Sequence, residues 1–160
     1  MKTKPVPEGY EGAIPYLRCR NAAGALAFYK KAFGAVEAMR LTMPDGKLGH
    51  AEFKIGGAVI MLSDEFPEMG VLGPQAIGGS PVTVLIYVAD VDAFVAGATV
   101  AGATVVNPVA DQFYGDRNCR LADPFGHSWM FATRQENLTP EEQIRRAEAL
   151  FAKKAPAAGK

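Results

Sequence analysis

The chain has little cysteine, no excess of charge of either sign and no long apolar segment free of breakers. Its 160 residues include two cysteines, Cys19 and Cys119. Two are too few for a disulfide framework, so we expect reduced thiols and a cytoplasmic protein. Lys and Arg together number 17, and so do Asp and Glu, whereas proteins that bind nucleic acids or anionic membranes usually carry a basic excess. The two long uncharged stretches, 69–89 and 93–110, both contain glycine and proline, which disfavours a membrane-spanning helix. We expect no nucleic acid and no membrane among the partners.

The signals that begin and end helices and hairpins occur twice at a constant spacing. With 49% hydrophobic and 21% charged residues, the composition is that of a globular domain. Helix caps, helix-ending glycines and hairpin exits recur 69 residues apart (Asn21 and Asp90), 68 apart (Gly34 and Gly102) and 69 apart (Ala58 and His127). Three matching spacings predict a duplicated βαβββ module.

Each module is expected to contain one helix and four strands. Alternation and turn signals place the strands at 14–19, 36–43, 48–55 and 58–63, and again at 82–88, 104–108, 117–123 and 127–133. A capping box at 139–142 begins a final helix. We predict an α+β fold in which two tandem βαβββ modules form half-barrel sheets around a cavity, followed by a C-terminal helix. The expected segments are an N-terminal extension (1–11), the first module (12–64), a linker (65–80), the second module (81–134) and a C-terminal helix and tail (135–160).

The face of each sheet that its helix leaves open is predicted to bind a ligand. Turn geometry places Glu52 opposite Met61 and Arg120 opposite Met130 on these faces. A solvated polar face is the alternative, but large apolar groups among a few polar ones are more typical of a pocket. Glu52 and Arg120 occupy equivalent positions in the two modules and are expected to pair or to share a polar ligand. The predicted ligand-binding residues are Tyr16, Arg18, His50, Glu52, Met61, Tyr87, Tyr114, Arg117, Asn118, Arg120 and Met130.

The duplication, together with two local motifs, resembles a known superfamily. Phe28-Tyr29 in the first helix and the Asp-Pro-Phe-Gly-His hairpin at 123–127 are similar to the vicinal-oxygen-chelate group of glyoxalases, bleomycin- and fosfomycin-resistance proteins and extradiol dioxygenases. The resemblance covers about 12–134. The stretches 49–52 (Gly-His-Ala-Glu) and 114–117 (Tyr-Gly-Asp-Arg) look like a narrower PhnB-like subgroup. This resemblance implies a small-molecule ligand and a homodimer, which in some relatives exchanges modules between chains.

The resemblance also identifies four positions where the superfamily's metalloenzymes carry histidine, glutamine or glutamate. Here these positions hold Ile14, Met61, Thr83 and Met130. None supplies an imidazole or carboxylate for a divalent ion, so we expect no cofactor. The alternative is one divalent metal at a shifted site, with His50, Glu52 and Asp64 as ligands.

Three functions follow as hypotheses. The first is metal-free binding of a small organic ligand. The second is a metal-dependent glyoxalase-type lyase or isomerase, or a dioxygenase-like enzyme, with Glu52 or His50 as the base. The third is an interaction module with a vestigial pocket. Trp129 is expected to pack against the helix of its own module, and both cysteines are expected to point away from the cavity.

Overall fold

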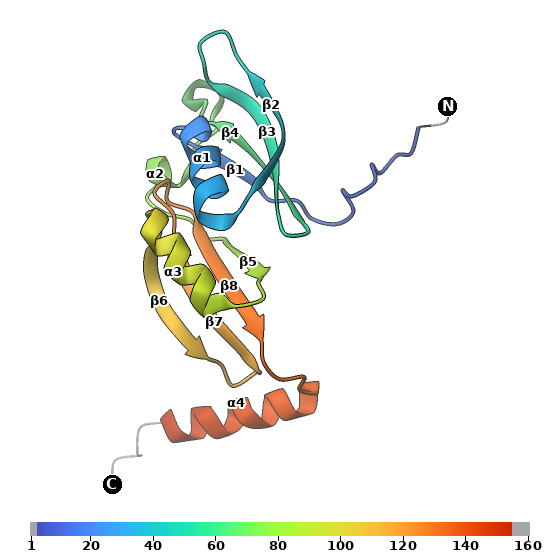
Figure 1. Cartoon of the computed structure of the whole chain (residues 1–160), viewed down its shortest axis with the longest axis vertical. Helices are drawn as coiled ribbons and strands as arrows, with labels where there is room; N and C mark the ends of the chain where they lie inside the picture. Colours follow the sequence, from blue (N-terminus) through green and yellow to red (C-terminus); the bar gives the residue numbers. More distant parts are fainter. Residues whose placement is uncertain (1–2, 155–160) are drawn as a thin grey trace.

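Two four-stranded sheets follow one another along the long axis of the molecule (Figure 1). The computed structural model describes residues 3–154. In each sheet the first strand lies beside the fourth and is parallel to it, and the remaining neighbours are antiparallel. The strand orders are β1-β4-β3-β2 and β5-β8-β7-β6. The predicted α+β fold of two βαβββ units is confirmed. The tail expected at the end of 135–160 lies partly outside the described residues.

Every predicted strand and helix is present, with ends shifted by a few residues. The first unit comprises β1 (Tyr16–Cys19), α1 (Ala22–Phe33), β2 (Val36–Thr42), β3 (Leu48–Ile55) and β4 (Ala58–Asp64). The second comprises β5 (Thr83–Tyr87), α3 (Val91–Ala101), β6 (Thr104–Asp111), β7 (Asp116–Ala122) and β8 (Ser128–Arg134), and α4 (Pro140–Lys154) follows. The linker holds two short helical turns, η1 (Pro67–Met69) and α2 (Pro74–Ile77), which the sequence pattern did not predict. Among residues 3–154 no helix is long and apolar enough to span a membrane.

The residues predicted to cap and end the two helices do so in the structure. The Asn21 side chain accepts a hydrogen bond from the Gly24 backbone N–H at 2.9 Å, and Asp90 caps α3 in the same way. Gly34 ends α1 with φ of 65°, a left-handed conformation that costs glycine little. The two helices therefore begin and end at equivalent points of the two units.

An aromatic core crosses the boundary between the units. Trp129 of β8 was expected to pack against α3, but its ring lies against Tyr29 and Phe33 of α1, with centroids 5.2 and 5.1 Å away. Phe131 instead contacts the α3 side, with its ring 4.2 Å from Phe94. Trp129 is buried on the helix side of its sheet as expected, and its ring also reaches α1 because α1 packs against α3. The two units thus share one hydrophobic core.

A buried carboxylate joins the same two units. Asp123 accepts hydrogen bonds from the Tyr29 hydroxyl at 2.7 Å, from Trp129 Nε1 at 2.8 Å and from the backbone N–H groups of Phe125 and His127 at 2.9 Å each. The His127 ring lies 3.4 Å from the same carboxylate. Burial alone would raise the pKa of Asp123, but His127 and the hydrogen-bond donors outweigh it and hold the pKa below its usual value. This carboxylate is ionised in the folded protein at neutral pH.

We expect Tyr29→Phe to lower the free energy of unfolding by about 1–3 kcal/mol at pH 7, because it removes a donor from a buried carboxylate. The matched control is Tyr87→Phe, which also removes a hydroxyl bonded to a carboxylate but from a half-exposed side chain; its cost should stay below about 1 kcal/mol. Urea denaturation measures both. Because the pKa of Asp123 is lower in the folded than in the unfolded protein, its ionised carboxylate stabilises the fold at pH values above the unfolded-state pKa of about 3.9. This stabilisation is lost as the pH falls below that value. The gap between wild type and Tyr29→Phe should therefore narrow in acid, and equal costs for the two variants would contradict the argument.

Candidate functional site

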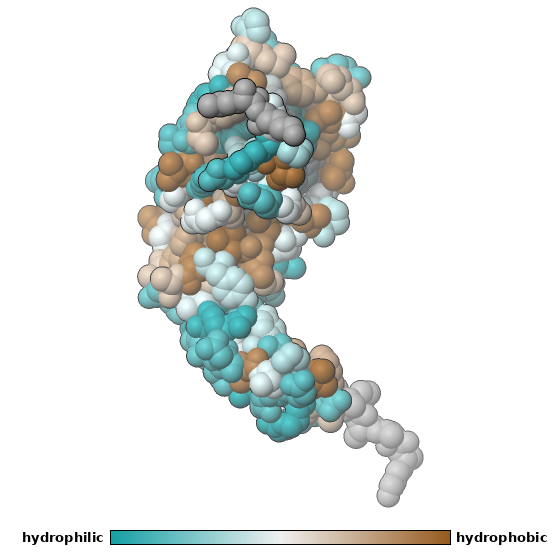
Figure 2. All heavy atoms as spheres, turned by 90° about the vertical axis from the view of Figure 1, so that its right-hand side faces the viewer, coloured by the Kyte–Doolittle hydropathy of each residue, from teal (hydrophilic) through white to brown (hydrophobic). Residues whose placement is uncertain are grey.

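Each sheet has a face opposite its helix, which we call the first open face (β1–β4) and the second open face (β5–β8). Glu52 pairs with Met61, and Arg120 with Met130, as the two turns predicted. Seen from the right-hand side of Figure 1, hydrophobic and hydrophilic residues are interspersed over the two units, whereas α4 is mostly hydrophilic (Figure 2). The register pairs a charged residue with a methionine on each open face, and such a mixture of apolar and polar groups is typical of a ligand site.

On the first open face, polar side chains form a continuous hydrogen-bonded chain. The Tyr16 hydroxyl lies 2.7 Å from His50 Nδ1, and His50 Nε2 lies 3.0 Å from Glu52 Oε1. The Tyr10 hydroxyl donates to the other Glu52 oxygen. The Arg18 guanidinium lies over the Tyr16 ring, 3.8 Å from its centroid. The bonds from Tyr10 and His50 lower the pKa of Glu52 against a smaller opposing effect of burial, so this carboxylate is an ionised acceptor.

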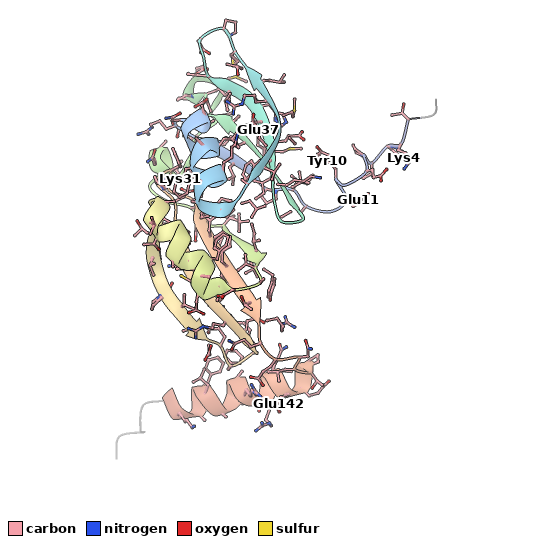
Figure 3. The ribbon with its side chains drawn as sticks, in the orientation of Figure 1. Lys4, Tyr10, Glu11, Lys31, Glu37 and Glu142 are labelled. Atoms are coloured by element: carbon pink, nitrogen blue, oxygen red, sulfur yellow. The ribbon has the colours of Figure 1, made fainter. Side chains whose placement is uncertain are left out.

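Tyr10 is a member of this cluster that the sequence analysis missed. It lies on the segment before β1. The part of this segment nearest β1 passes the first sheet, and its N-terminal part extends away from the rest of the molecule (Figures 1 and 3). A turn closed by the Tyr10 N–H and the Pro7 carbonyl at 3.2 Å shapes this segment locally. Alternation patterns cannot identify such a contact, because the segment is neither strand nor helix. The stretch 1–11, expected as an extension, thus contributes a side chain to the first open face.

The second open face holds a pocket of about 340 Å³. Asn118 donates to the Tyr114 hydroxyl at 2.7 Å, and Gln112 lies 3.3 Å from the Asn118 oxygen. Arg120 is exposed and forms no side-chain hydrogen bond or ion pair with the described residues. Four of the predicted binding residues meet in this pocket, whose lining is Asn107, Pro108, Ala110, Gln112, Tyr114, Asn118, Arg120 and Met130. The pocket therefore offers an unpaired guanidinium beside an apolar thioether wall.

The expected pair of Glu52 and Arg120 does not form within the chain. Glu52 bonds to Tyr10 and His50, and Arg120 lies in the pocket of the other sheet. The two sheets lie end to end rather than face to face, and the units meet chiefly through α1 and α3. Equivalent positions in a duplicated fold share a local environment, but they need not share a cavity.

Arg117 and Tyr87 lie apart from this pocket. Arg117 bonds to Asp92 of α3 and to Asp111 at 2.7 and 2.8 Å, so it lies on the helix side of the sheet and not at the rim of the open face. Tyr87 donates to Asp116, which also accepts from Arg134 at 2.7 Å. The prediction of Arg117 as a ligand-binding residue of the open face is therefore not supported, because Arg117 and its neighbours Asp116 and Asn118 face opposite sides of the strand.

The four positions that the superfamily resemblance assigns to metal do not fit a divalent ion. Met61 and Met130 lie on the open faces and offer thioether sulfur, a donor for soft ions only. The other two positions offer a hydrocarbon, Ile14, and a hydroxyl, Thr83, which is bonded to Ser128 at 2.8 Å. Throughout residues 3–154, no three His, Cys, Asp or Glu side chains gather in a metal-binding arrangement.

The alternative metal site also lacks its third ligand. Asp64 is buried, and its two oxygens accept from the backbone N–H groups of Ala22 at 3.0 Å and Leu48 at 2.7 Å. The carboxylate at the end of β4 thus holds the start of α1 and the start of β3, and it is not available as a metal ligand beside His50 and Glu52. The donor set of the described residues therefore does not fit the expected alternative.

A second apolar pocket lies between the two units. It has a volume of about 350 Å³ and is lined by residues of β1 and β5, by Leu72, Pro74 and Ile77 of the linker and by Val82, which precedes β5. The sequence of 65–80 predicted only a linker, because its glycines and prolines interrupt any periodic pattern. Tyr16 and Arg18 border this pocket as well, so the first open face continues into it.

Comparison with known proteins identifies the family to which this chain belongs. The sequence profile of the glyoxalase/bleomycin resistance protein/dioxygenase superfamily matches residues 13–131, and the chain belongs to that family. An uncharacterized Mycobacterium tuberculosis protein, Rv0887c, is 49% identical over 118 residues, covering 72% of this chain and 69% of its own. TioX from Micromonospora sp. ML1 is 26% identical with a TM-score of 0.61, covering 81% of this chain and all of TioX. The Listeria monocytogenes fosfomycin resistance protein FosX, crystallised with Mn(II) and sulfate, is 17% identical and shares the fold, with a TM-score of 0.61 over 86% of this chain and 98% of FosX.

Neither cysteine belongs to the open faces. Cys19 and Cys119 are fully buried, as expected from strand alternation. Burial, reinforced by the nearby Asp123 charge, raises the pKa of Cys19 to about 12, and burial also raises the pKa of Cys119. The thiolate is the reactive form of cysteine, so both thiols are inert in the folded protein.

We expect iodoacetamide at pH 8 to leave the native protein unlabelled and to add two groups after unfolding in guanidinium, as measured by intact mass. The reason is that both thiols are buried and protonated at this pH. Rapid labelling of Cys19 in the native state would contradict its placement in the core.

Proposed function

We propose that this protein binds a small organic ligand on its open faces without a metal ion. The observation that carries the proposal is the pocket on the second open face, where Arg120, unpaired among the described residues, lies beside Met130 and Tyr114. A guanidinium beside apolar and aromatic groups suits a ligand that is partly apolar or aromatic and carries an anionic or polar group. The family includes bleomycin resistance proteins by name, which supports a binding role. The motifs at 49–52 and 114–117 favour the PhnB-like subgroup.

We further propose that the binding unit is a homodimer. On the first open face, Met39 and Leu41 of edge strand β2 lie opposite Glu52 and His50 and expose 38% and 57% of their surfaces. An exposed edge strand with apolar side chains favours pairing with another surface. A second copy could set the first open face of one protomer against the second open face of its partner. Arg120 would then meet the Glu52 cluster between chains.

The metal-dependent enzyme is supported less well. FosX was crystallised with Mn(II), but its similarity to this chain extends to the fold alone, and the ligand positions here do not fit such an ion. Metal analysis of protein purified without a chelator separates the two functions, since one ion per chain would favour the enzyme. A vestigial pocket in an interaction module would bind no small molecule at all.

We expect Arg120→Met to weaken binding of the anionic aromatic probe anilinonaphthalene sulfonate roughly tenfold, equivalent to about 1.4 kcal/mol. The change removes the charge but keeps a long apolar side chain, and its effect on stability should stay within about 0.5 kcal/mol because Arg120 is exposed. Fluorescence titration measures the affinity. The matched control is Arg145→Met on α4, where the arginine is paired with Glu142 away from both open faces. Equal affinity of wild type and Arg120→Met would contradict the assignment of this pocket.

We expect sedimentation equilibrium at micromolar concentration to give twice the chain mass of 17.0 kDa. Leu41→Asp should shift the protein to monomer, because it places a charge in the proposed contact. Val100→Asp is the control, since Val100 exposes 88% of its surface on α3, away from the open faces. A wild-type monomer, or dissociation by both variants alike, would contradict the proposed interface.

A further inference from the structure

The hydrogen bonds of Tyr16, His50 and Glu52 run in one direction. The Glu52 carboxylate can only accept, so in the neutral form of the ring His50 Nε2, 3.0 Å away, is the donor. His50 Nδ1 is then the acceptor for the Tyr16 hydroxyl at 2.7 Å. A hydroxyl bonded to an imidazole that a carboxylate orients is the arrangement of an activated nucleophile and its base.

We propose that Tyr16, His50 and Glu52 form a metal-free general-base site, in which the Tyr16 oxygen takes a proton from a small acidic ligand. This inference rests on the proposed binding of a ligand at the open faces and assigns a chemical role to one of them. Tyr16 is the catalytic residue because its hydroxyl faces the open side. His50 and Glu52 act through it.

The proposed step balances with one substrate and no redox partner. The Tyr16 proton moves to His50 Nδ1 while the phenol oxygen accepts the proton of the ligand. The ligand becomes an anion, His50 becomes an imidazolium, and the Glu52 carboxylate pairs with that imidazolium. Reversing the transfer, or returning the proton to another atom of the ligand, restores the protein.

The surroundings favour this charge distribution. Arg18 holds its guanidinium over the Tyr16 ring and bonds to Ser63, which fixes a positive charge beside the place where the ligand anion forms. Tyr10 occupies the second oxygen of Glu52 and so holds the carboxylate in place. Lys54 is the further charged residue on this face of β3, two positions beyond Glu52.

The charge pattern identifies the chemical class of the ligand. Arg18 would stabilise an enolate or phenolate oxygen, so the fitting substrates are small carbonyl compounds with an acidic neighbouring C–H and small phenols or enols.

Tyr87 provides an internal comparison for Tyr16. Tyr16 lies on β1 and exposes 42% of its surface, and Tyr87 lies on the equivalent strand β5 and exposes 50%. The Tyr87 hydroxyl bonds directly to the Asp116 carboxylate, whereas the Tyr16 hydroxyl bonds to an imidazole. Of these two tyrosines, Tyr16 is the one whose hydroxyl lies against an imidazole nitrogen, which can accept its proton.

The test uses p-nitrophenyl acetate, whose acetyl group an activated phenol oxygen accepts as p-nitrophenolate leaves and the phenol proton passes to the base. Peptide mass spectrometry at pH 8 reports acetylation of each tyrosine. We expect Tyr16 to react at least roughly tenfold faster than Tyr87, and His50→Gln to reduce Tyr16 to the Tyr87 rate. Tyr87→Phe should leave the Tyr16 rate unchanged. Equal wild-type rates, or a Tyr16 rate that survives His50→Gln, would overturn the proposal.

A second measurement does not depend on any variant folding. The chain has two histidines, His50 and His127, so long-range ¹H–¹⁵N spectra of the wild type resolve both rings. The neutral His50 ring should carry its proton on Nε2, and a proton on Nδ1 would overturn the proposal. Binding of anilinonaphthalene sulfonate with an unreactive Tyr16 would leave the binding function standing and reject the base. A reactive Tyr16 with no binding would reject the binding function instead.

Discussion

The ionised carboxylate of Asp123 is the contact on which the joining of the two units depends. It lies in a tight hairpin of the second unit and accepts from Tyr29 in the helix of the first. A buried charge is unfavourable unless it is fully bonded, so the hairpin, Trp129 and α1 must all be in place together. The same residues pack as one aromatic core. This contact fixes the relative position of the two sheets, and hence of the two open faces.

Duplication has supplied two similar faces that now differ in charge. Position 52 of the first unit holds a carboxylate, and its equivalent, Arg120, holds a guanidinium. The first face is closed internally by hydrogen bonds from Tyr10 and His50, whereas the Arg120 guanidinium has no such partner among the described residues. These contacts are the basis for proposing proton transfer on the first face and the binding of an anionic group on the second. One scaffold thus presents a carboxylate and a guanidinium at equivalent positions of its two faces.

Short sequence patterns correctly predicted the features that depend on neighbouring residues alone, such as turns, helix caps and strand register. The Gly56-Gly57 turn was enough to place Glu52 opposite Met61, since a two-residue loop sets the register. Alternation also places Arg117 with the buried Cys119 on the helix side, so its prediction as a ligand-binding residue went against that pattern. The crossing of Trp129 onto α1 and the return of Tyr10 to Glu52 could not be predicted, because they depend on contacts between segments far apart in the chain.

The attachment of Tyr10 has an evolutionary consequence. None of the described residues before β1 belongs to the hydrophobic core, so substitutions among them should cost little folding free energy. Its one bond to Glu52 nevertheless alters the electrostatics of the first open face. Relatives can therefore diverge in ligand chemistry through this segment while their sheets and helices stay unchanged. Substitutions in this segment would therefore change the ligand with the smallest loss of folding free energy, because the segment lies outside the two βαβββ units.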